Sequence, residues 1–248
     1  MPPWCWPVPS VSGGPCAADP SPQIFWSFMP SRFKAVLFDH DGTLVESEAV
    51  HHAIWNQVLQ PYGVQIPLEL FMADFSGVPA ITNGHDIKKR YALAPDAAEL
   101  ADTKNAMTAE YLATHAFPLM PGVRESLTRL NAAGLRKGVV TGARMFAIAA
   151  TLRSRALAPE FEIVISADEV VHSKPAPECY LLALEKMGLQ AHEAVAFEDT
   201  EHGVASAIAA GLACVAIPTA MSAVQDFSAA TVVVPDMASA VDWVLKQG

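Results

Sequence analysis

The sequence lacks an excess of positive charge: its 16 Lys and Arg residues are outnumbered by 26 Asp and Glu residues, which gives a formal net charge of −10. A general nucleic-acid binder needs clustered Lys and Arg to contact the phosphate backbone. We therefore expect no nucleic-acid partner. Any phosphorylated ligand of so acidic a chain must be met by a local cation or by a metal ion.

The sequence also lacks long apolar runs, and it contains little cysteine. No run approaches the roughly 18 apolar residues that a membrane-spanning helix needs, so we expect a soluble chain with no membrane partner. Hydrophobic residues make up 52% of the chain, which is enough for a sizeable core. No C-x-x-C pair occurs among the cysteines Cys5, Cys16, Cys179 and Cys214. This pattern favours free thiols in a reducing cytoplasm, and we expect a cytoplasmic protein.

The first 32 residues differ from the rest of the chain. They are rich in Pro, Gly and Ser, follow neither the helical nor the strand period, and contain no Lys or Arg before Arg32. The basic start of a secretory signal is therefore missing. We expect a disordered leader over residues 1–32. The alternatives are a Pro-rich arm that binds a partner, and a start codon placed too early, with Met29 as the natural start.

From Arg32 onward, short apolar runs alternate with helical patterns. We expect strands at residues 34–38, 138–141, 163–166, 194–197, 213–217 and 231–234, and helices at 123–133, 145–155, 177–187, 203–210 and 238–246. This alternation predicts an α/β fold with a parallel sheet covered on both faces. In such sheets ligands bind at the carboxyl ends of the strands, and every notable polar cluster of this chain follows a predicted strand.

Residues 47–120 interrupt the alternation. They contain helical patterns at 48–60, 68–71, 85–91 and 99–115, with no convincing strand between them. An insert that leaves after the first strand and returns before the second indicates an all-helical cap over the active end of the sheet. The predicted domains are therefore a core of residues 33–46 and 121–248 and a cap of residues 47–120.

The first polar cluster is Asp39-His40-Asp41-Gly42-Thr43, directly after a predicted strand. Two carboxylates separated by one residue can divide the work of a phosphoryl transfer. One attacks phosphorus and binds metal, while the other protonates the leaving oxygen and then activates water. Gly42 permits the tight turn that lets both face one pocket. A lone D-x-D is often only a solvated turn, but D-x-D-G-T after a strand is far more specific.

Two further clusters offer groups that bind an anion. Thr141, Gly142 and Arg144 follow the second core strand, where a hydroxyl and backbone N–H groups at a helix start suit a phosphate,. The alternatives are a plain helix cap for Thr141 and solvated surface for Arg144. Lys174, in the segment Lys-Pro-Ala-Pro, is a fixed cation that would reduce repulsion between Asp39 and an incoming phosphate,.

The fourth cluster is acidic. Glu198 and Asp199 follow another predicted strand, and carboxylates at a strand end suit Mg²⁺, which prefers carboxylates, water and substrate phosphate,. Capping of the next helix by Asp199 or Thr200 is the alternative, and both roles can hold together.

In this order, these residues resemble the four sequence motifs of the haloacid dehalogenase superfamily, and the resemblance covers residue 33 to the C-terminus. It is strongest for the subgroup with a helical cap, which includes phosphoglycolate phosphatase, sugar-phosphate phosphatases and β-phosphoglucomutase. The resemblance implies a Rossmann-like core and a phosphatase that depends on Mg²⁺. It also implies a role for each motif residue: Asp39 as nucleophile, Asp41 as general acid and base with its backbone carbonyl on the metal, Thr141 and Lys174 on the phosphoryl group, and Glu198 with Asp199 completing the metal site.

The sequence departs from that pattern at several points. His40 stands where the family has an apolar residue, and Gly142-Ala143 stands where Asn or Ser often follows. The segment 75–79 resembles the cap loop of these enzymes and makes Gly77 a candidate substrate contact, as is His51 on the first cap helix, although a packing role for His51 is as reasonable. The cap-loop cations of β-phosphoglucomutase align with Ser76 and Ala80, which argues against a mutase.

We therefore expect a phosphatase that acts on a small phosphorylated metabolite, of the sugar-phosphate or phosphoglycolate type. A phosphomutase is the alternative, and a catalytically silent binding protein on the same scaffold is a weaker one. We expect a monomer or a weak dimer.

Overall fold

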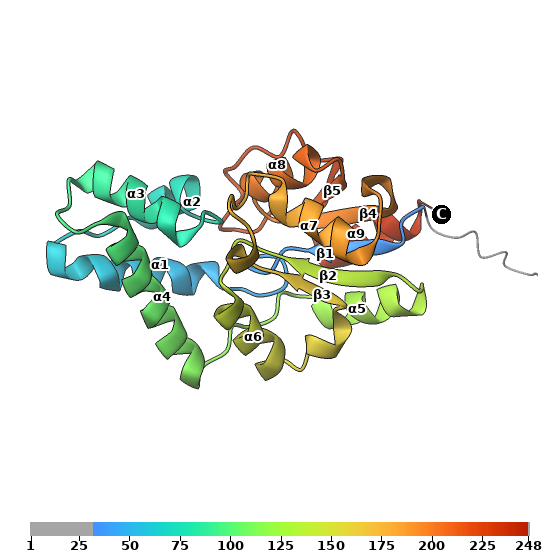
Figure 1. The fold of residues 1–248 in the computed structure, drawn as a ribbon, viewed down its shortest axis with the longest axis horizontal. Helices are drawn as coiled ribbons and strands as arrows, with labels where there is room; N and C mark the ends of the chain where they lie inside the picture. The colour runs from blue at the N-terminus through green and yellow to red at the C-terminus, as the bar shows by residue number, and fades with distance from the viewer. Residues whose placement is uncertain (1–31, 248) are drawn as a thin grey trace, which may run out of the picture.

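The computed structural model describes residues 32–247 (Figure 1). Except for Arg32, the leader predicted over residues 1–32 lies outside the described residues, as do Cys5 and Cys16. Cys179 and Cys214 are buried free thiols. Within the described part of the chain, no helix has both the length and the apolar character needed to cross a bilayer.

The core is a six-stranded sheet in the order β3-β2-β1-β4-β5-β6, with every neighbouring pair parallel. The strands are β1 (Ala35–Phe38), β2 (Arg136–Val140), β3 (Ile163–Ile165), β4 (Ala194–Glu198), β5 (Ala213–Ala216) and β6 (Val232–Val233). The α/β fold class predicted from the alternating pattern is confirmed. All residues of β1 and β4 are buried, as expected for strands covered on both faces,.

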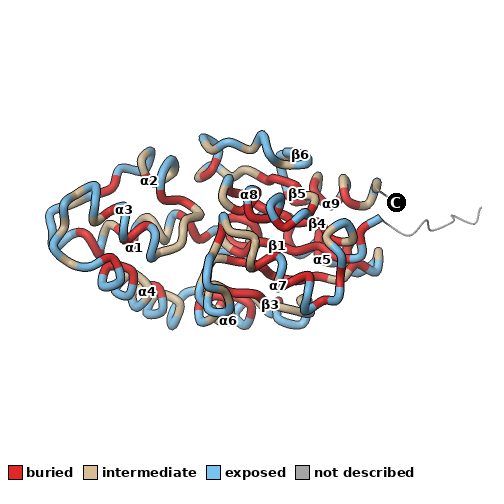
Figure 2. The backbone as a smooth tube through the Cα atoms, turned by 45° about the horizontal axis from the view of Figure 1, so that its top comes forward, coloured by how far each residue is buried: buried red, intermediate tan, exposed pale blue. Residues whose placement is uncertain are grey.

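Helices cover both faces of this sheet, as Figure 1 shows. They are α5 (Val123–Ala132), α6 (Met145–Ser154), α7 (Glu178–Met187), α8 (Glu201–Ala209) and α9 (Met237–Leu245). Successive side chains of β1 enter opposite layers. Val36 and Phe38 belong to the hydrophobic cluster that includes residues of α5, α6 and α9. Ala35 and Leu37 belong to the cluster built with α7 and α8. In Figure 2 the buried residues are concentrated along these strands.

The helical insert forms a separate group on one side of the sheet (Figure 1). It consists of α1 (Glu48–Leu59), a 3₁₀ turn (Gln60–Tyr62), α2 (Leu68–Asp74), α3 (Ala80–Tyr91) and α4 (Ala97–Thr114). A third hydrophobic cluster, which includes Trp55, Phe71 and Phe75, lies within this insert. The domain limits proposed from the sequence, at residues 46/47 and 120/121, stay a prediction.

Helix α3 begins five residues before the start predicted from the sequence pattern. Gly84 lies inside it, although glycine weakens helices by about 1 kcal/mol relative to Ala. A Cβ atom at Gly84 would lie 2.5 Å from the carbonyl oxygen of Ala97. The missing side chain therefore lets α3 pack closely against the start of α4.

Candidate active site

Polar residues from three adjacent strands meet at the carboxyl end of the sheet. Asp39 follows β1, Thr141 follows β2, and Glu198 ends β4. The register pairs Phe38 with Phe197 and so sets Asp39 beside Glu198. Carboxylate oxygens of Asp39, Glu198 and Asp199 lie within 4.8 Å of one another, and all three residues are buried. The sequence reasoning that placed these groups at one edge of the sheet agrees with this geometry.

The turn after β1 is shaped by Gly42. Its φ is +80°, a backbone conformation that glycine adopts without strain,. A Cβ atom at this position would lie 1.9 Å from Oδ2 of Asp199. Thr43 donates a hydrogen bond to Oδ1 of Asp199 at 3.3 Å. Gly42 is thus required both for the turn and for the close approach of the Asp199 carboxylate.

Lys174 is the cation at the centre of this cluster. Its side chain is 5% exposed and its ammonium group donates to Oδ1 of Asp39 at 2.5 Å, to Oε1 of Glu198 at 2.6 Å and to the carbonyl oxygen of Val140 at 2.8 Å. Burial opposes the charge of this amine, but the charges of Asp39 and Glu198 outweigh burial and raise the pKa of Lys174. The three donated bonds fix the ammonium beside Asp39. The role of this cation toward an incoming anion stays a prediction.

One ammonium does not balance three carboxylates. Burial raises the pKa of Asp39 and Asp199, and raises the pKa of Glu198 to about 7, in spite of the nearby Lys174. Oε2 of Glu198 and Oδ2 of Asp199 are buried without a hydrogen-bond partner. Buried oxygens of this kind are costly unless a cation or donor meets them. The residues present therefore fit a divalent cation bound by oxygen ligands, such as Mg²⁺.

The Asp41 carboxylate lies outside this cluster and turns toward the insert. Its Oδ1 accepts a hydrogen bond from the Ser47 hydroxyl at 2.5 Å and lies 3.4 Å from Nε2 of His51. Its Oδ2 lies 3.2 Å from Nδ1 of the buried His40. Burial alone would raise the pKa of Asp41, but the neighbouring His40 and His51 hold it well below its ordinary value. Asp41 is therefore ionised in this state.

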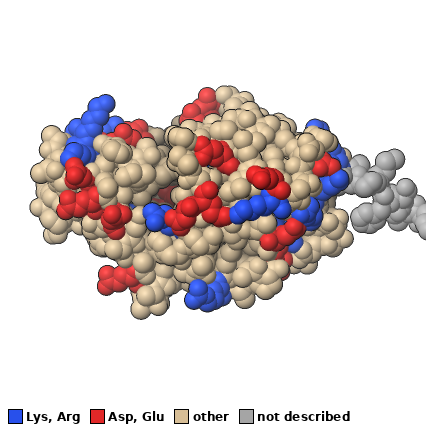
Figure 3. All heavy atoms as spheres, viewed as in Figure 1, with Lys and Arg blue, Asp and Glu red and all other residues tan. Residues whose placement is uncertain are grey.

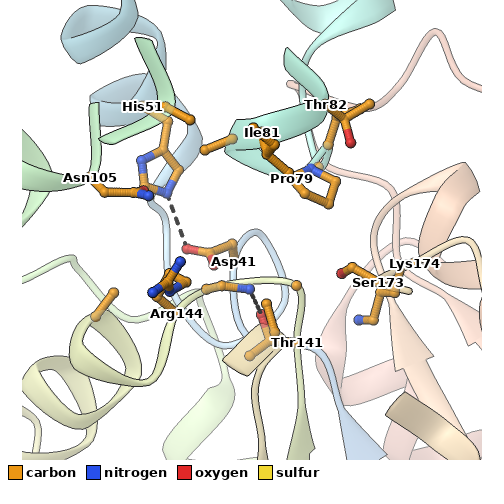
Figure 4. Close-up of a pocket in the computed structure, with 18 of the residues that line it drawn as sticks. Asp41, His51, Pro79, Ile81, Thr82, Asn105, Thr141, Arg144, Ser173 and Lys174 are labelled. Atoms are coloured by element: carbon orange, nitrogen blue, oxygen red, sulfur yellow. Dashed lines mark hydrogen bonds and ion pairs between the residues drawn. The ribbon is translucent and has the colours of Figure 1, made fainter. Parts of the chain in front are cut away.

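These residues line one cavity of about 640 Å³ between the sheet end and the insert. Asp39, Asp41, His51, Gly77, Thr141, Gly142, Arg144 and Lys174, which are candidates from the sequence, all lie on its wall. In Figure 4, His51 lies on the insert side, opposite Thr141 and Arg144. Glu198 and Asp199 are the two candidates buried beneath this wall.

Three of these candidates already have neighbours in the structure. Nε of Arg144 lies 2.5 Å from a carboxylate oxygen of Asp168, and the Arg144 side chain is 57% exposed. Gly77 has a φ of +73°, and a Cβ atom there would lie 2.3 Å from Thr200. The Thr141 hydroxyl accepts a hydrogen bond from the backbone N–H of Ala143 at 3.0 Å. Arg144 would have to leave or share Asp168 in order to bind a phosphate.

Sequence reasoning missed four residues that the structure places at or beside the site. Tyr180 is fully buried and donates a hydrogen bond to Oε1 of Glu198 at 2.5 Å. Glu48 and Lys104 line the cavity from the insert, and Ser76 donates a hydrogen bond to Glu48. Glu48 and Lys104 belong to helices whose polar residues are normally solvated, so the sequence alone carried no signal for them.

On the face seen in Figure 3, Lys and Arg are interspersed with Asp and Glu.

Comparison with known proteins adds independent findings. A protein-family model described as haloacid dehalogenase-like hydrolase matches residues 33–211. The chain is 37% identical over 219 residues to the protein CbbY of Rhodobacter capsulatus, which covers 84% of this chain and 95% of that protein. It is 32% identical over 186 residues to the fructose-1-phosphate phosphatase YqaB of Escherichia coli, which covers 74% of this chain and 96% of the relative.

A solved structure has the same fold. The crystal structure of CbbY from Rhodobacter sphaeroides in complex with phosphate superposes with a TM-score of 0.74 at 25% sequence identity. The superposition covers 83% of this chain and 95% of that chain. It therefore includes most of both the sheet and the helical insert.

Proposed function

We propose that this chain, which belongs to the haloacid dehalogenase-like hydrolase family, is a phosphatase that hydrolyses a phosphorylated sugar through a phosphorylated Asp39. The observation that carries the proposal is the Asp39 carboxylate on the cavity wall, held through Oδ1 by the buried ammonium of Lys174. Two relatives support the substrate class by their names alone: the fructose-1-phosphate phosphatase YqaB and the hexitol phosphatase A of Escherichia coli.

In the first step, a carboxylate oxygen of Asp39 attacks phosphorus and the bond from phosphorus to the sugar oxygen breaks. Lys174 holds Oδ1, and Oδ2 has no hydrogen-bond donor among residues 32–247. Oδ2 is therefore the oxygen available for attack. Thr141 and Gly142 line the same cavity as Asp39 and would bind the phosphoryl oxygens. The fixed ammonium offsets the negative charge that would otherwise repel the dianionic substrate.

Asp41 gives a proton to the leaving sugar oxygen in this step. It is ionised in the free state, because His40 and His51 hold its pKa well below the ordinary value. A dianionic phosphate entering beside it adds like charge, which raises a carboxyl pKa and favours the protonated form. Ser47 and His51 keep the carboxyl group facing the cavity through contacts to Oδ1.

In the second step, water attacks phosphorus and the bond to Asp39 breaks, which releases inorganic phosphate. The Asp41 carboxylate, now without its proton, takes one from the attacking water. Transfer of its proton to the sugar oxygen has already left Asp41 ionised, which is the form that can act as a base. The same carboxyl group thus serves as acid and then as base.

Asp39, Glu198 and Asp199, with the Asp41 backbone carbonyl expected from the family resemblance, would hold Mg²⁺. A bound Mg²⁺ would supply positive charge to the phosphoryl oxygens and bring Asp39 and the phosphate together. The unpartnered oxygens of Glu198 and Asp199 are the structural reason for assigning a cation to this place.

The cap-loop positions 76 and 80 favour a phosphatase over a phosphomutase. A mutase needs cations that bind the second phosphate while the bisphosphorylated intermediate is reoriented. The positions where such cations were expected are Ser76 and Ala80, and Ser76 donates its hydroxyl to a carboxylate, that of Glu48. Neither side chain is a cation, so neither can donate a charge-assisted hydrogen bond to a phosphate.

The proposal is tested with a panel of phosphorylated sugars and Mg²⁺, scored for released phosphate. The wild-type chain should release phosphate from at least one sugar phosphate, and Asp39→Asn should release none while keeping its circular dichroism spectrum. Conversion of β-glucose 1-phosphate to glucose 6-phosphate much faster than phosphate release would instead establish the mutase.

A further inference from the structure

We propose that Glu48 binds a hydroxyl group on the carbon chain of the substrate and so selects hydroxylated sugar phosphates over phosphoglycolate. This inference rests on the proposed phosphatase function and assigns a residue to its choice of substrate. Phosphoglycolate has a carboxylate where a sugar phosphate has hydroxylated carbons. The two classes therefore present opposite chemistry to a carboxylate in the insert.

The Glu48 carboxylate is buried and faces the cavity. Glu48 is the first residue of α1, is 6% exposed and lines the same cavity as Asp39 and Asp41. The Ser76 hydroxyl donates a hydrogen bond to Oε2 of Glu48 at 3.0 Å. No other hydrogen bond or ion pair to Glu48 occurs among residues 32–247, so Oε1 is left to accept one.

A buried carboxylate with a single neutral donor is not a stable arrangement by itself. Burial raises the pKa of Glu48, with the charges of His51 and Asp41 acting in opposite directions. A hydroxyl donor to Oε1 would offset part of the cost of burial. A sugar phosphate brings such donors with it, and a hydroxyl hydrogen bond to a charged acceptor is among the stronger protein–ligand contacts.

Two of the three cations on the cavity wall are already paired with carboxylates of the chain. Among the described residues that line the cavity, Lys and Arg occur at Lys104, Arg144 and Lys174. Lys174 is bound to Asp39 and Glu198, and Arg144 is paired with Asp168. Burial lowers the pKa of Lys104, and the nearby charges of Asp41 and Glu48 oppose that shift. The Lys104 ammonium has no hydrogen bond or ion pair among residues 32–247, and Glu48 is one of the charges that act on it. A substrate carboxylate would therefore be repelled by Glu48 and would have to compete with Glu48 for Lys104.

Two other groups on the insert side of the cavity are neutral and suit hydroxyls. Thr82 and Asn105 line it, and both can accept and donate hydrogen bonds,. In Figure 4 both lie on the insert side, above Asp41 and Thr141. Glu48 is thus one of several side chains on this wall that can form hydrogen bonds with substrate hydroxyl groups.

The position of Glu48 is fixed relative to the phosphoryl site through Ser76. The side-chain amide of Gln225, from the core, donates to the backbone carbonyls of Ser76 and Met72 at 3.4 Å each. The next residue, Gly77, packs against Thr200, which follows the proposed metal ligand Asp199. Substitution of Ser76 should therefore act on specificity by releasing Glu48, and not by removing a contact to phosphate.

The test compares kcat/KM for fructose 1-phosphate, phosphoglycolate and p-nitrophenyl phosphate, whose leaving group offers no aliphatic hydroxyl. Wild type is measured beside Glu48→Ala and Glu48→Gln, and Gln can still accept the Ser76 hydrogen bond. Glu110→Gln, which removes an exposed carboxylate of α4 outside the cavity, is the matched control. Ratios between substrates within one variant are independent of the fraction of protein that folds.

Wild type should prefer fructose 1-phosphate to phosphoglycolate. In Glu48→Ala the ratio of kcat/KM for fructose 1-phosphate over p-nitrophenyl phosphate should fall about 10- to 100-fold, as for loss of a hydrogen bond to a charged group. In Glu48→Gln the kcat/KM for phosphoglycolate should rise relative to p-nitrophenyl phosphate, because the repulsion is gone. Glu110→Gln should leave both ratios at the wild-type value.

A Glu48→Ala variant with unchanged ratios, or a wild-type preference for phosphoglycolate, would overturn the role of Glu48 and leave the phosphatase assignment in place. Release of phosphate from none of the three compounds by wild type with Mg²⁺ would overturn the phosphatase assignment and this inference with it.

Discussion

Alanine at Gly42 separates the backbone role of this residue from its role in the metal site. The substitution has two effects in the structure. A φ of +80° costs an L-residue about 1–2 kcal/mol,. In addition, the new Cβ atom would lie 1.9 Å from Oδ2 and 2.5 Å from Cγ of Asp199. No rotation of the methyl group relieves such a contact, so the Asp199 carboxylate must move.

Gly134→Ala provides the matched control. Gly134 has a φ of +71°, and a Cβ atom there would have no neighbour within 4 Å. Gly134→Ala should lose about 1–2 kcal/mol of stability, which lowers the melting temperature of a chain of this size by about 2–8 °C. Gly42→Ala should lose at least as much, because the contact with Asp199 adds to the backbone cost. Only Gly42→Ala should also disturb the metal site.

The assay is Mg²⁺ titration by calorimetry, with the melting temperature measured with and without Mg²⁺. Gly42→Ala should bind Mg²⁺ at least 10- to 100-fold more weakly, the range found when groups that orient metal ligands are removed. Gly134→Ala should bind Mg²⁺ like wild type. Equal Mg²⁺ affinity in Gly42→Ala and wild type would refute the placement of Asp199 in the metal site.

The remaining predictions concern the charges around Lys174. Lys174→Met leaves buried carboxylates without their cation and should cost about 3–5 kcal/mol at pH 8, and less at pH 6 as they take up protons; equal losses at both pH values in thermal denaturation would contradict this. In the folded chain the pKa of Glu198 is raised to about 7. Between the ordinary pKa of a glutamate and pH 7, the folded chain therefore binds more protons than the unfolded chain. The metal-free protein should therefore lose stability as pH rises through that window, while Mg²⁺ affinity rises from pH 6 to pH 8; a Mg²⁺ Kd that does not change with pH would disprove it. Tyr180→Phe removes the hydrogen bond to Oε1 of Glu198. It should lower the free energy of unfolding by about 1–3 kcal/mol and weaken Mg²⁺ binding. Denaturation and Mg²⁺ titration curves that match those of wild type would contradict this.

The fold and the centre of the site follow from short-range sequence patterns. The runs around residues 35–38 and 194–198 are apolar and stand between helical patterns, which is enough to predict parallel strands. Since the carboxyl ends of parallel strands meet at one edge, the sequence alone predicts that Asp39 and Asp199 lie near each other. Lys174 is expected beside Asp39 because of its Lys-Pro-Ala-Pro context; its place in the chain alone does not predict this, since β3, the strand before it, is separated from β1 by β2.

The substrate side of the cavity did not follow from the sequence. Glu48 and Ser76 are 28 positions apart and meet only because α1 and the cap loop pack on each other. Tyr180 occupies a helical position with apolar neighbours, so the pattern predicts plain core packing. Its hydroxyl reaches Glu198 only in the folded chain. Such contacts depend on tertiary packing, which periodicity does not encode.

The central claim is a covalent phosphoryl group on Asp39, and acid quenching during turnover tests it most directly. Wild-type chain is mixed with Mg²⁺ and a ³²P-labelled sugar phosphate that it hydrolyses, quenched in acid within the first turnover, and digested for peptide analysis. The account predicts label that is stable in acid, is released by hydroxylamine as expected for an acyl phosphate, and maps to the peptide containing Asp39. The same treatment of Asp39→Asn should leave the peptide unlabelled. Label on another residue, or full turnover by Asp39→Asn, would contradict the account.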